Sequence, residues 1–146
     1  MKEVRWHHAL ILGLAVMVAV WVLIFWPEPL PPETLPPPSE IVIPWDEARS
    51  HVGKMKVVEG PVVGGTFNTG SMGKPTFLHI GKPYPDPDRF SVLIWLDHRS
   101  KFLHKFPPDP ETHLLNKTVG VRGFIDDDKG YPEIILTDPA DIWVIE

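Results

Sequence analysis

The chain of 146 residues contains no cysteine, and this absence removes several classes of protein at once. Disulfide-stabilised scaffolds, cysteine-ligated zinc, iron–sulfur clusters, thiol catalysis and a lipid anchor on cysteine are all excluded. An excess of positive charge is also lacking: the formal net charge is −5, whereas a dedicated nucleic-acid binder normally shows a basic footprint. Proline is abundant instead, and 18 prolines are too many for a helical bundle, because each one inside a helix costs about 3 kcal/mol.

Residues 9–26 form a run of 18 residues without a charge and predict a transmembrane helix. As a helix this run would span about 27 Å, close to the roughly 30 Å hydrocarbon core of a bilayer. It ends in bulky residues and not in a small-x-small cleavage site, so an uncleaved anchor is favoured over a signal peptide. The residues expected at the membrane interfaces or at helix contacts are Trp6, Gly13, Ala15, Ala19, Trp21 and Trp26.

The charges on either side of this segment predict its orientation. Lys2 and Arg5 precede it, and no further Lys or Arg occurs until Arg49. The positive-inside rule therefore places residues 1–8 in the cytoplasm and the rest of the chain on the other side. We expect a single-pass protein of the inner membrane with a periplasmic C-terminal domain.

Residues 27–44 form a proline-rich linker between the anchor and the domain. Proline has no N–H to donate and fixes φ, so neither helix nor sheet is expected here. As an extended polyproline II segment, residues 27–39 would reach about 40 Å. Three interpretations stay open: a stiff stalk that lifts a domain off the bilayer, a strap docked along a partner protein, or a ligand for a proline-reading module.

Residues 45–146 predict one domain, mainly of β-strands, preceded in the chain by the single transmembrane helix. A short helix is expected at 45–52, ended by Gly53. Apolar and β-branched residues predict five strands: Lys54–Val63, Thr76–Ile80, Phe90–Leu96, Lys117–Ile125 and Tyr131–Leu136. Short strands, one insertion at 98–116 and a closing hairpin are typical of a five-stranded Greek-key barrel of the OB type. A sandwich fits less well, because it would need about seven strands.

Four segments of this domain carry a resemblance to a known family. Residues 77–85 (FLHIGKPYP) and 90–94 (FSVLI) look like the second and third strands of small bacterial OB-fold proteins of the nucleic-acid-binding, tRNA-anticodon-domain type. Residues 116–125 and 130–142 are similar to the fourth and fifth strands and the closing turn of those proteins. The resemblance covers roughly residues 44–143 and implies an OB barrel, carried in this chain on an N-terminal membrane anchor.

Candidate partner-binding residues are aromatic, sulfur-containing or cationic. They come from the strands on the expected OB face, a glycine-rich loop and the most basic stretch of the chain: Phe67, Met72, Phe77, Tyr84, Trp95, Arg99 and Lys101. Aromatic rings there are suited to stacking on bases, and nearby cations to facing phosphates. The carboxylates at 126–128 would repel phosphates at one rim, so nucleic acid is not the expected partner.

No catalytic, cofactor or metal site is predicted. The glycine-rich loop 64–74 lacks the GxxxxGK[ST] pattern, and the acidic run 126–128 lacks the alternating spacing of a calcium loop. Metal-ligand spacing on a clear helix is likewise missing from His98, His104 and His113. We therefore expect no cofactor, no bound metal and no enzymatic activity.

Together these patterns predict a non-enzymatic, membrane-anchored OB-fold interaction module. Its expected role is that of an accessory or structural subunit of a larger integral membrane protein complex, contacted through the helix and the strap, with membrane lipid as a further neighbour. The alternative is binding of single-stranded nucleic acid or oligosaccharide by the barrel.

Overall fold

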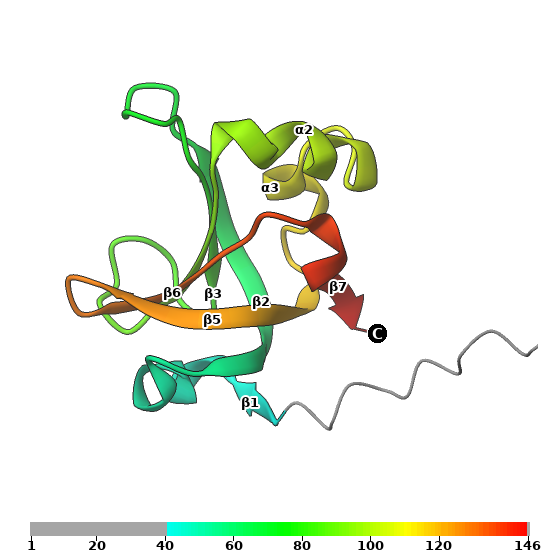
Figure 1. Cartoon of the computed structure of the whole chain (residues 1–146). Coiled ribbons are helices and arrows are strands. Elements are labelled where there is room, and N and C mark those ends of the chain that lie inside the picture. Colours follow the sequence, from blue (N-terminus) through cyan, green and yellow to red (C-terminus); the bar gives the residue numbers. More distant parts are fainter. Residues whose placement is uncertain (1–40, 146) are drawn as a thin grey trace, which may run out of the picture. The chain divides into compact units, whose positions relative to one another are not determined.

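A computed structural model describes residues 41–145 of the chain (Figure 1). The predicted transmembrane helix, the six anchor residues and most of the linker lie outside the described residues. Within residues 41–145, no helix combines the length and the apolar character needed to cross a bilayer.

Five strands close into a barrel: β2 (Met55–Phe67), β3 (Thr76–Ile80), β4 (Phe90–Ile94), β5 (Thr118–Asp128) and β6 (Tyr131–Ile135). They pair in the order β2-β3-β4-β6-β5, and β5 pairs back onto β2, which completes the ring. Within this ring β4 and β6 run parallel, and the other neighbours run antiparallel. This connectivity is that of the OB-type Greek-key barrel, and it confirms the predicted fold of the domain.

Two further strands extend the described sheet beyond the barrel, so the predicted count of five is too low. β1 (Val42–Pro44) pairs in parallel with the start of β2, and β7 (Ile142–Ile145) pairs antiparallel with β5. The prediction that the linker up to Pro44 forms no sheet is therefore wrong for β1. The reason is local. Residues 41–43 are β-branched and have N–H groups that can donate hydrogen bonds, which favours a strand. The proline stands at the strand end, where the lack of an N–H group matters little.

β2 changes partners along its length, and this bends it into the barrel. Its first half pairs with β5, and its second half pairs with β3 after a register shift between Val62 and Gly64. The sequence predicts a bulge or an edge at the Gly60-Pro61 pair. That pair keeps a regular register with β5, and the irregularity lies just beyond it, between Val62 and Gly64. The strand does not end at Val63, however, but continues to Phe67.

The insertion between β4 and β5 forms two helices, α2 (Leu96–Lys105) and α3 (Pro110–His113), at one end of the barrel (Figure 1). α3 begins after Asp109, whose carboxylate accepts a hydrogen bond from the Thr112 N–H at 2.7 Å. The sequence predicts that Phe102, Leu103 and Phe106 fill this barrel end. Both phenylalanines are buried in the core, whereas Leu103 is 38% exposed and the prediction is wrong for it.

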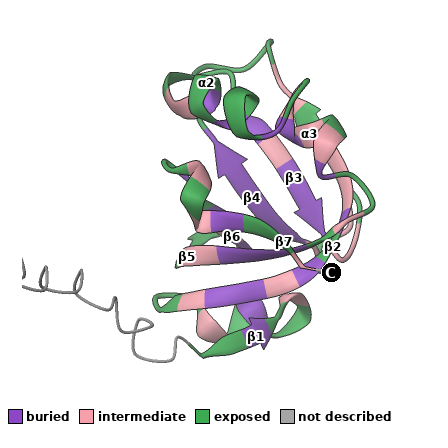
Figure 2. Ribbon diagram, turned by 90° about the vertical axis from the view of Figure 1, so that its right-hand side faces the viewer, coloured by how far each residue is buried: buried purple, intermediate pink, exposed green. Residues whose placement is uncertain are grey.

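The opposite end of the barrel is covered by a short 3₁₀ helix, η1 (Trp45–His51), and a second one, η2 (Pro139–Asp141), precedes β7. The ring of Trp45 packs against the core and onto two glycines. A Cβ at Gly60 would lie 2.6 Å from the indole, and one at Gly81 would overlap it. Between the two ends, all five residues of β4 are buried (Figure 2).

Candidate functional site

A groove of about 680 Å³ lies on one face of the barrel. Its floor comes from the second half of β2 and from β3 and β4, and its walls come from the β3–β4 loop and the β5–β6 hairpin. The sequence predicts a binding surface at the strands corresponding to β3 and β4, and this groove lies there. Its volume falls in the range of small-molecule sites in proteins, roughly 300–1,000 Å³.

A polar row crosses the floor of the groove from β2 to β5. Gly64 pairs with His79, His79 with Ser91, Ser91 with Glu133, and Glu133 with Asp126. Residues that are direct partners in neighbouring strands project to the same face of a sheet, so side chains from four successive strands share this row. Gly64 contributes none, and a Cβ there would meet only His79, at 3.7 Å. The glycine therefore keeps one end of the groove open.

Planar side chains form a continuous arc along the groove. The Phe77 ring stacks near the His79 ring, with centroids 6.2 Å apart and an interplanar angle of 13°. His79 lies 6.1 Å from Tyr84, and the Arg89 guanidinium carbon lies 5.1 Å from the Tyr84 centroid and 4.6 Å from that of Tyr131. Arg89 thus joins the β3–β4 loop to the β5–β6 hairpin through cation–π contacts.

Two polar atoms in this arc are buried without a hydrogen-bond partner among residues 41–145: Nδ1 of His79 and Nε of Arg89. Buried polar atoms in native proteins are nearly always paired, so such atoms in a groove point to a ligand or to bound water. Arg89 is anchored through Nη1, which donates to the Asp86 carbonyl at 2.8 Å. Burial, and secondarily the charge of Arg89, lowers the pKa of His79, so the ring is neutral at pH 7.

The hairpin side of the groove is acidic. Glu133 and Asp128 line it, and Asp126 is the strand partner of Glu133. Burial, followed by the charges of Asp128 and Asp126, raises the pKa of Glu133. Arg89 is the one Lys or Arg among the lining residues, so two carboxylates outnumber the single fixed cation.

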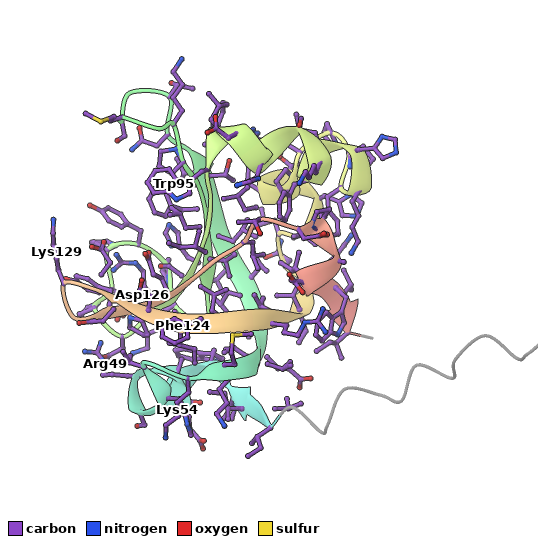
Figure 3. All side chains as sticks on the ribbon, viewed as in Figure 1. Arg49, Lys54, Trp95, Phe124, Asp126 and Lys129 are labelled. Carbon is purple, nitrogen blue, oxygen red and sulfur yellow. The ribbon has the colours of Figure 1, made fainter. Side chains whose placement is uncertain are left out.

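The predicted partner-binding residues are divided between three places. Phe77 and Tyr84 line the groove. Trp95 is 38% exposed and packs over Gly73 at the base of the loop between β2 and β3, while Met72 on that loop is 96% exposed. Figure 3 shows Trp95 near this loop and Asp126 on the hairpin. Trp95 and Met72 are outside the groove lining, and their part in partner binding stays a prediction.

Phe67, Arg99 and Lys101 belong to the helical end of the barrel. Phe67 is next to the groove residue Thr66 in β2 and therefore projects to the other face. Arg99 lies over the Phe67 ring with its guanidinium carbon 3.9 Å from the centroid, and it forms a two-point ion pair with Glu111 at 2.7 and 3.0 Å. Arg99 is 8% exposed and its charge is paired with Glu111 within the domain, and its part in partner binding stays a prediction. Lys101 is exposed on α2.

Several groove residues were not selected from the sequence as partner-binding residues: Gly64, His79, Arg89, Ser91, Tyr131 and Glu133. A signal for His79 was present, because alternation in Thr76–Ile80 places it on the same face as the predicted residue Phe77. Ser91 and Glu133 required the strand order, since the pairing of β4 with β6 joins residues distant in sequence. Among residues 41–145, no group of three or more His, Asp or Glu side chains is arranged to hold a metal ion.

Comparison with known proteins shows similarity at the level of solved structures. No family model matches the chain, and no curated protein matches it in sequence. An aspartyl-tRNA synthetase from Entamoeba histolytica aligns over 74% of this chain and 22% of its own length, with a TM-score of 0.46 and 12% identity. The E. coli protein YgiW aligns over 74% of this chain and 94% of its own, with a TM-score of 0.42 and 16% identity.

The OBody AM1L10, in a structure bound to hen egg-white lysozyme, aligns over 66% of this chain and 84% of its own, with a TM-score of 0.41 and 20% identity. The chain spans about a fifth of the synthetase's length. Since these TM-scores lie below 0.5, the assignment of the OB-type barrel rests on the strand pairing described above.

Proposed function

We propose that the protein is a non-enzymatic interaction module, tethered to a membrane by residues 9–26, that binds its ligand in the groove of the OB-type barrel. The observation that carries this proposal is the arc of planar side chains from Phe77 to Tyr131, which contains two buried polar atoms without a partner in the described part of the chain. A concave site with aromatic walls and a few convergent polar groups is the usual form of a ligand site.

The wider role that we propose is that of an accessory subunit in a larger membrane assembly. The support comes from the sequence: an apolar run of 18 residues followed by a proline-rich segment provides a helix and a strap that suit contact with membrane partners. In this arrangement the helix and strap hold the assembly, and the groove remains open for a ligand on the outer side of the membrane.

The test separates these two parts. The full chain is extracted in mild detergent, and the molecules retained with it are identified by mass spectrometry for the natural chain and for Gly64→Val. The new valine fills the groove floor without backbone strain, because Gly64 lies in a strand and a Cβ there has room. The matched control is Gly70→Val, the same change in the loop between β2 and β3, outside the groove lining.

We expect larger membrane proteins to copurify with all three chains, and a groove ligand to be lost from Gly64→Val alone. If the natural chain runs as a free monomer, the accessory-subunit role is wrong. If Gly64→Val and Gly70→Val retain the same molecules in the same amounts, binding in the groove is wrong.

Single-stranded nucleic acid is the second candidate ligand. The rings of Phe77 and Tyr131 and the stacked Arg89 favour it, because bases stack on such platforms. The carboxylates of the hairpin oppose it, because they face the path that phosphates would follow. Nucleic-acid binding would lose affinity steeply as salt rises, which distinguishes it from binding of a neutral ligand.

A further inference from the structure

We propose that the ligand of the groove is an uncharged oligosaccharide, whose sugar rings stack on the planar arc and whose hydroxyls bind the polar row. This assignment rests on the proposed function of the groove and names the chemical class of its ligand. Three features of the lining support it: the balance of charge, the mixture of donors and acceptors, and the shape of the apolar wall.

The balance of charge argues against a polyanion. Glu133 and Asp128 line the groove, Asp126 stands beside Glu133, and Arg89 supplies the single guanidinium. A chain with one phosphate per nucleotide would place several negative charges beside these carboxylates, at a cost that one cation does not offset. An uncharged ligand avoids this repulsion altogether.

The polar atoms of the groove match hydroxyl groups, which both donate and accept. The carboxylates of Glu133 and Asp128 accept hydrogen bonds, and Nε of Arg89 donates one. The neutral ring of His79 presents a buried Nδ1 that accepts or donates according to its tautomer. The groove therefore holds both donors and acceptors, and the hydroxyl groups of a sugar can pair with either kind without carrying charge.

The apolar wall matches the flat faces of sugar rings. Phe77, Tyr84 and Tyr131 line one groove, with the planar groups of His79 and Arg89 between them. Sugar rings carry C–H groups on their faces, which pack on aromatic rings, and their hydroxyls lie at the edge, where they reach the polar row. Successive flat surfaces favour several linked units over a single sugar.

The test measures binding by the full chain in detergent micelles to two probes. One is a panel of neutral α- and β-linked hexose and N-acetylhexosamine oligosaccharides, and the other is oligodeoxythymidylate of roughly 12 nucleotides, within the site size of one OB barrel. Calorimetry is performed at low and at high salt. The matched variants are Phe77→Ala, which removes a ring from the groove, and Phe124→Ala, which removes an exposed ring outside the groove lining (Figure 3).

We expect at least one panel member to bind, with an affinity that salt leaves unchanged. Phe77→Ala should weaken this binding about tenfold, and Phe124→Ala should leave it as it is. Binding of the oligonucleotide alone, weakened by salt and by Phe77→Ala, would overturn the sugar assignment and leave the groove as the proposed binding site. Binding of neither probe also overturns the sugar assignment, and the retention experiment with Gly64→Val then decides separately whether the groove binds anything.

Discussion

Two arginines of this domain lie over aromatic rings, and the two sites differ in what else the arginine contacts. Arg99, at the helical end, lies over the Phe67 ring and donates hydrogen bonds to Glu111 and Thr76. Arg89, at the groove, stacks on two tyrosines and anchors one nitrogen on a backbone carbonyl, while its Nε has no partner among residues 41–145. Both terminal nitrogens of the Arg99 guanidinium donate hydrogen bonds within the fold. The Arg89 guanidinium has a donor, Nε, that we assign to a ligand.

The comparison shows that a cation–π contact alone does not mark a binding residue. Both arginines have one, and such contacts contribute only about 0.5–2 kcal/mol. The difference lies in hydrogen-bond satisfaction, because a buried donor without a partner is costly unless something occupies the site. The following predictions test this division between a structural arginine and a binding arginine.

Replacing the structural arginine should have the largest effect. Arg99→Met leaves Glu111 in a mostly buried position without its partner, and we expect the free energy of unfolding to fall by about 3 kcal/mol. Urea unfolding of the full chain in micelles, followed by near-ultraviolet circular dichroism, measures this change. The double variant Arg99→Met/Glu111→Leu should recover part of the loss, because no unpaired charge remains. A double variant that loses the sum of both single changes would contradict the ion-pair explanation.

Replacing Arg89, the binding arginine, should change stability little and ligand affinity strongly. Arg89→Met keeps much of the side-chain volume and gives up two cation–π contacts, so we expect stability to fall by only about 1 kcal/mol. Ligand affinity should fall about tenfold, because the charged donor is gone. Calorimetry and urea unfolding of the same preparation measure both quantities. A stability loss as large as that of Arg99→Met, with ligand affinity intact, would reverse the assignment of the two arginines.

The raised pKa of Glu133 predicts a gain in stability when its charge is removed. A carboxyl whose pKa is higher in the folded state binds more protons there, so stability falls as pH rises from the unfolded pKa to the raised folded value. That cost persists at neutral pH. Glu133→Gln should therefore raise the melting temperature at pH 7 and have little effect at a pH below the unfolded pKa. Equal shifts at both pH values would show that the charge of Glu133 is not responsible.

The lowered pKa of His79 predicts the smallest effect, confined to mildly acidic solution. Below the unfolded pKa of about 6.5 the unfolded chain binds a proton that the folded chain does not, so stability falls as pH decreases. His79→Gln removes this contribution and should flatten the fall in stability between neutral pH and the lowered folded pKa. Thermal melts across this interval provide the measurement, and an unchanged slope would contradict the prediction.

The sequence was sufficient for much of the fold because its signals are local. Alternation predicts Thr76–Ile80 with the ends that β3 has, and it predicts Phe90–Leu96 where β4 ends at Ile94. The Gly60-Pro61 pair stands just before the register shift in β2. Short strands were the weak point: β1 has three residues and β7 has four, too few for a periodic pattern. β1 was also obscured by the prolines around it.

The candidate site was predicted only in part, because the sequence does not show which side chains find hydrogen-bond or ion-pair partners within the fold. Phe77 and Tyr84 were found through the expected OB face, and both line the groove. Arg99 was selected for its charge, yet Glu111, twelve positions away on another helix, neutralises it. Arg89 was not among the predicted partner-binding residues. In the fold it lies over the ring of Tyr131, which comes from a strand distant in sequence, and both residues line the groove.

What the sequence by itself determined is the position of most strands and turns along the chain. Alternation of apolar and polar residues marks the strands, glycine and proline mark the interruptions, and an apolar run predicts a membrane anchor. These follow from backbone sterics and local periodicity. Only the tertiary structure decided which charged residues are free to bind. Closure of the barrel brings β4 beside β6 and sets Glu133 across from Ser91. The same closure pairs one arginine with a carboxylate and leaves the other, which lines the groove, with a buried Nε that has no partner among residues 41–145.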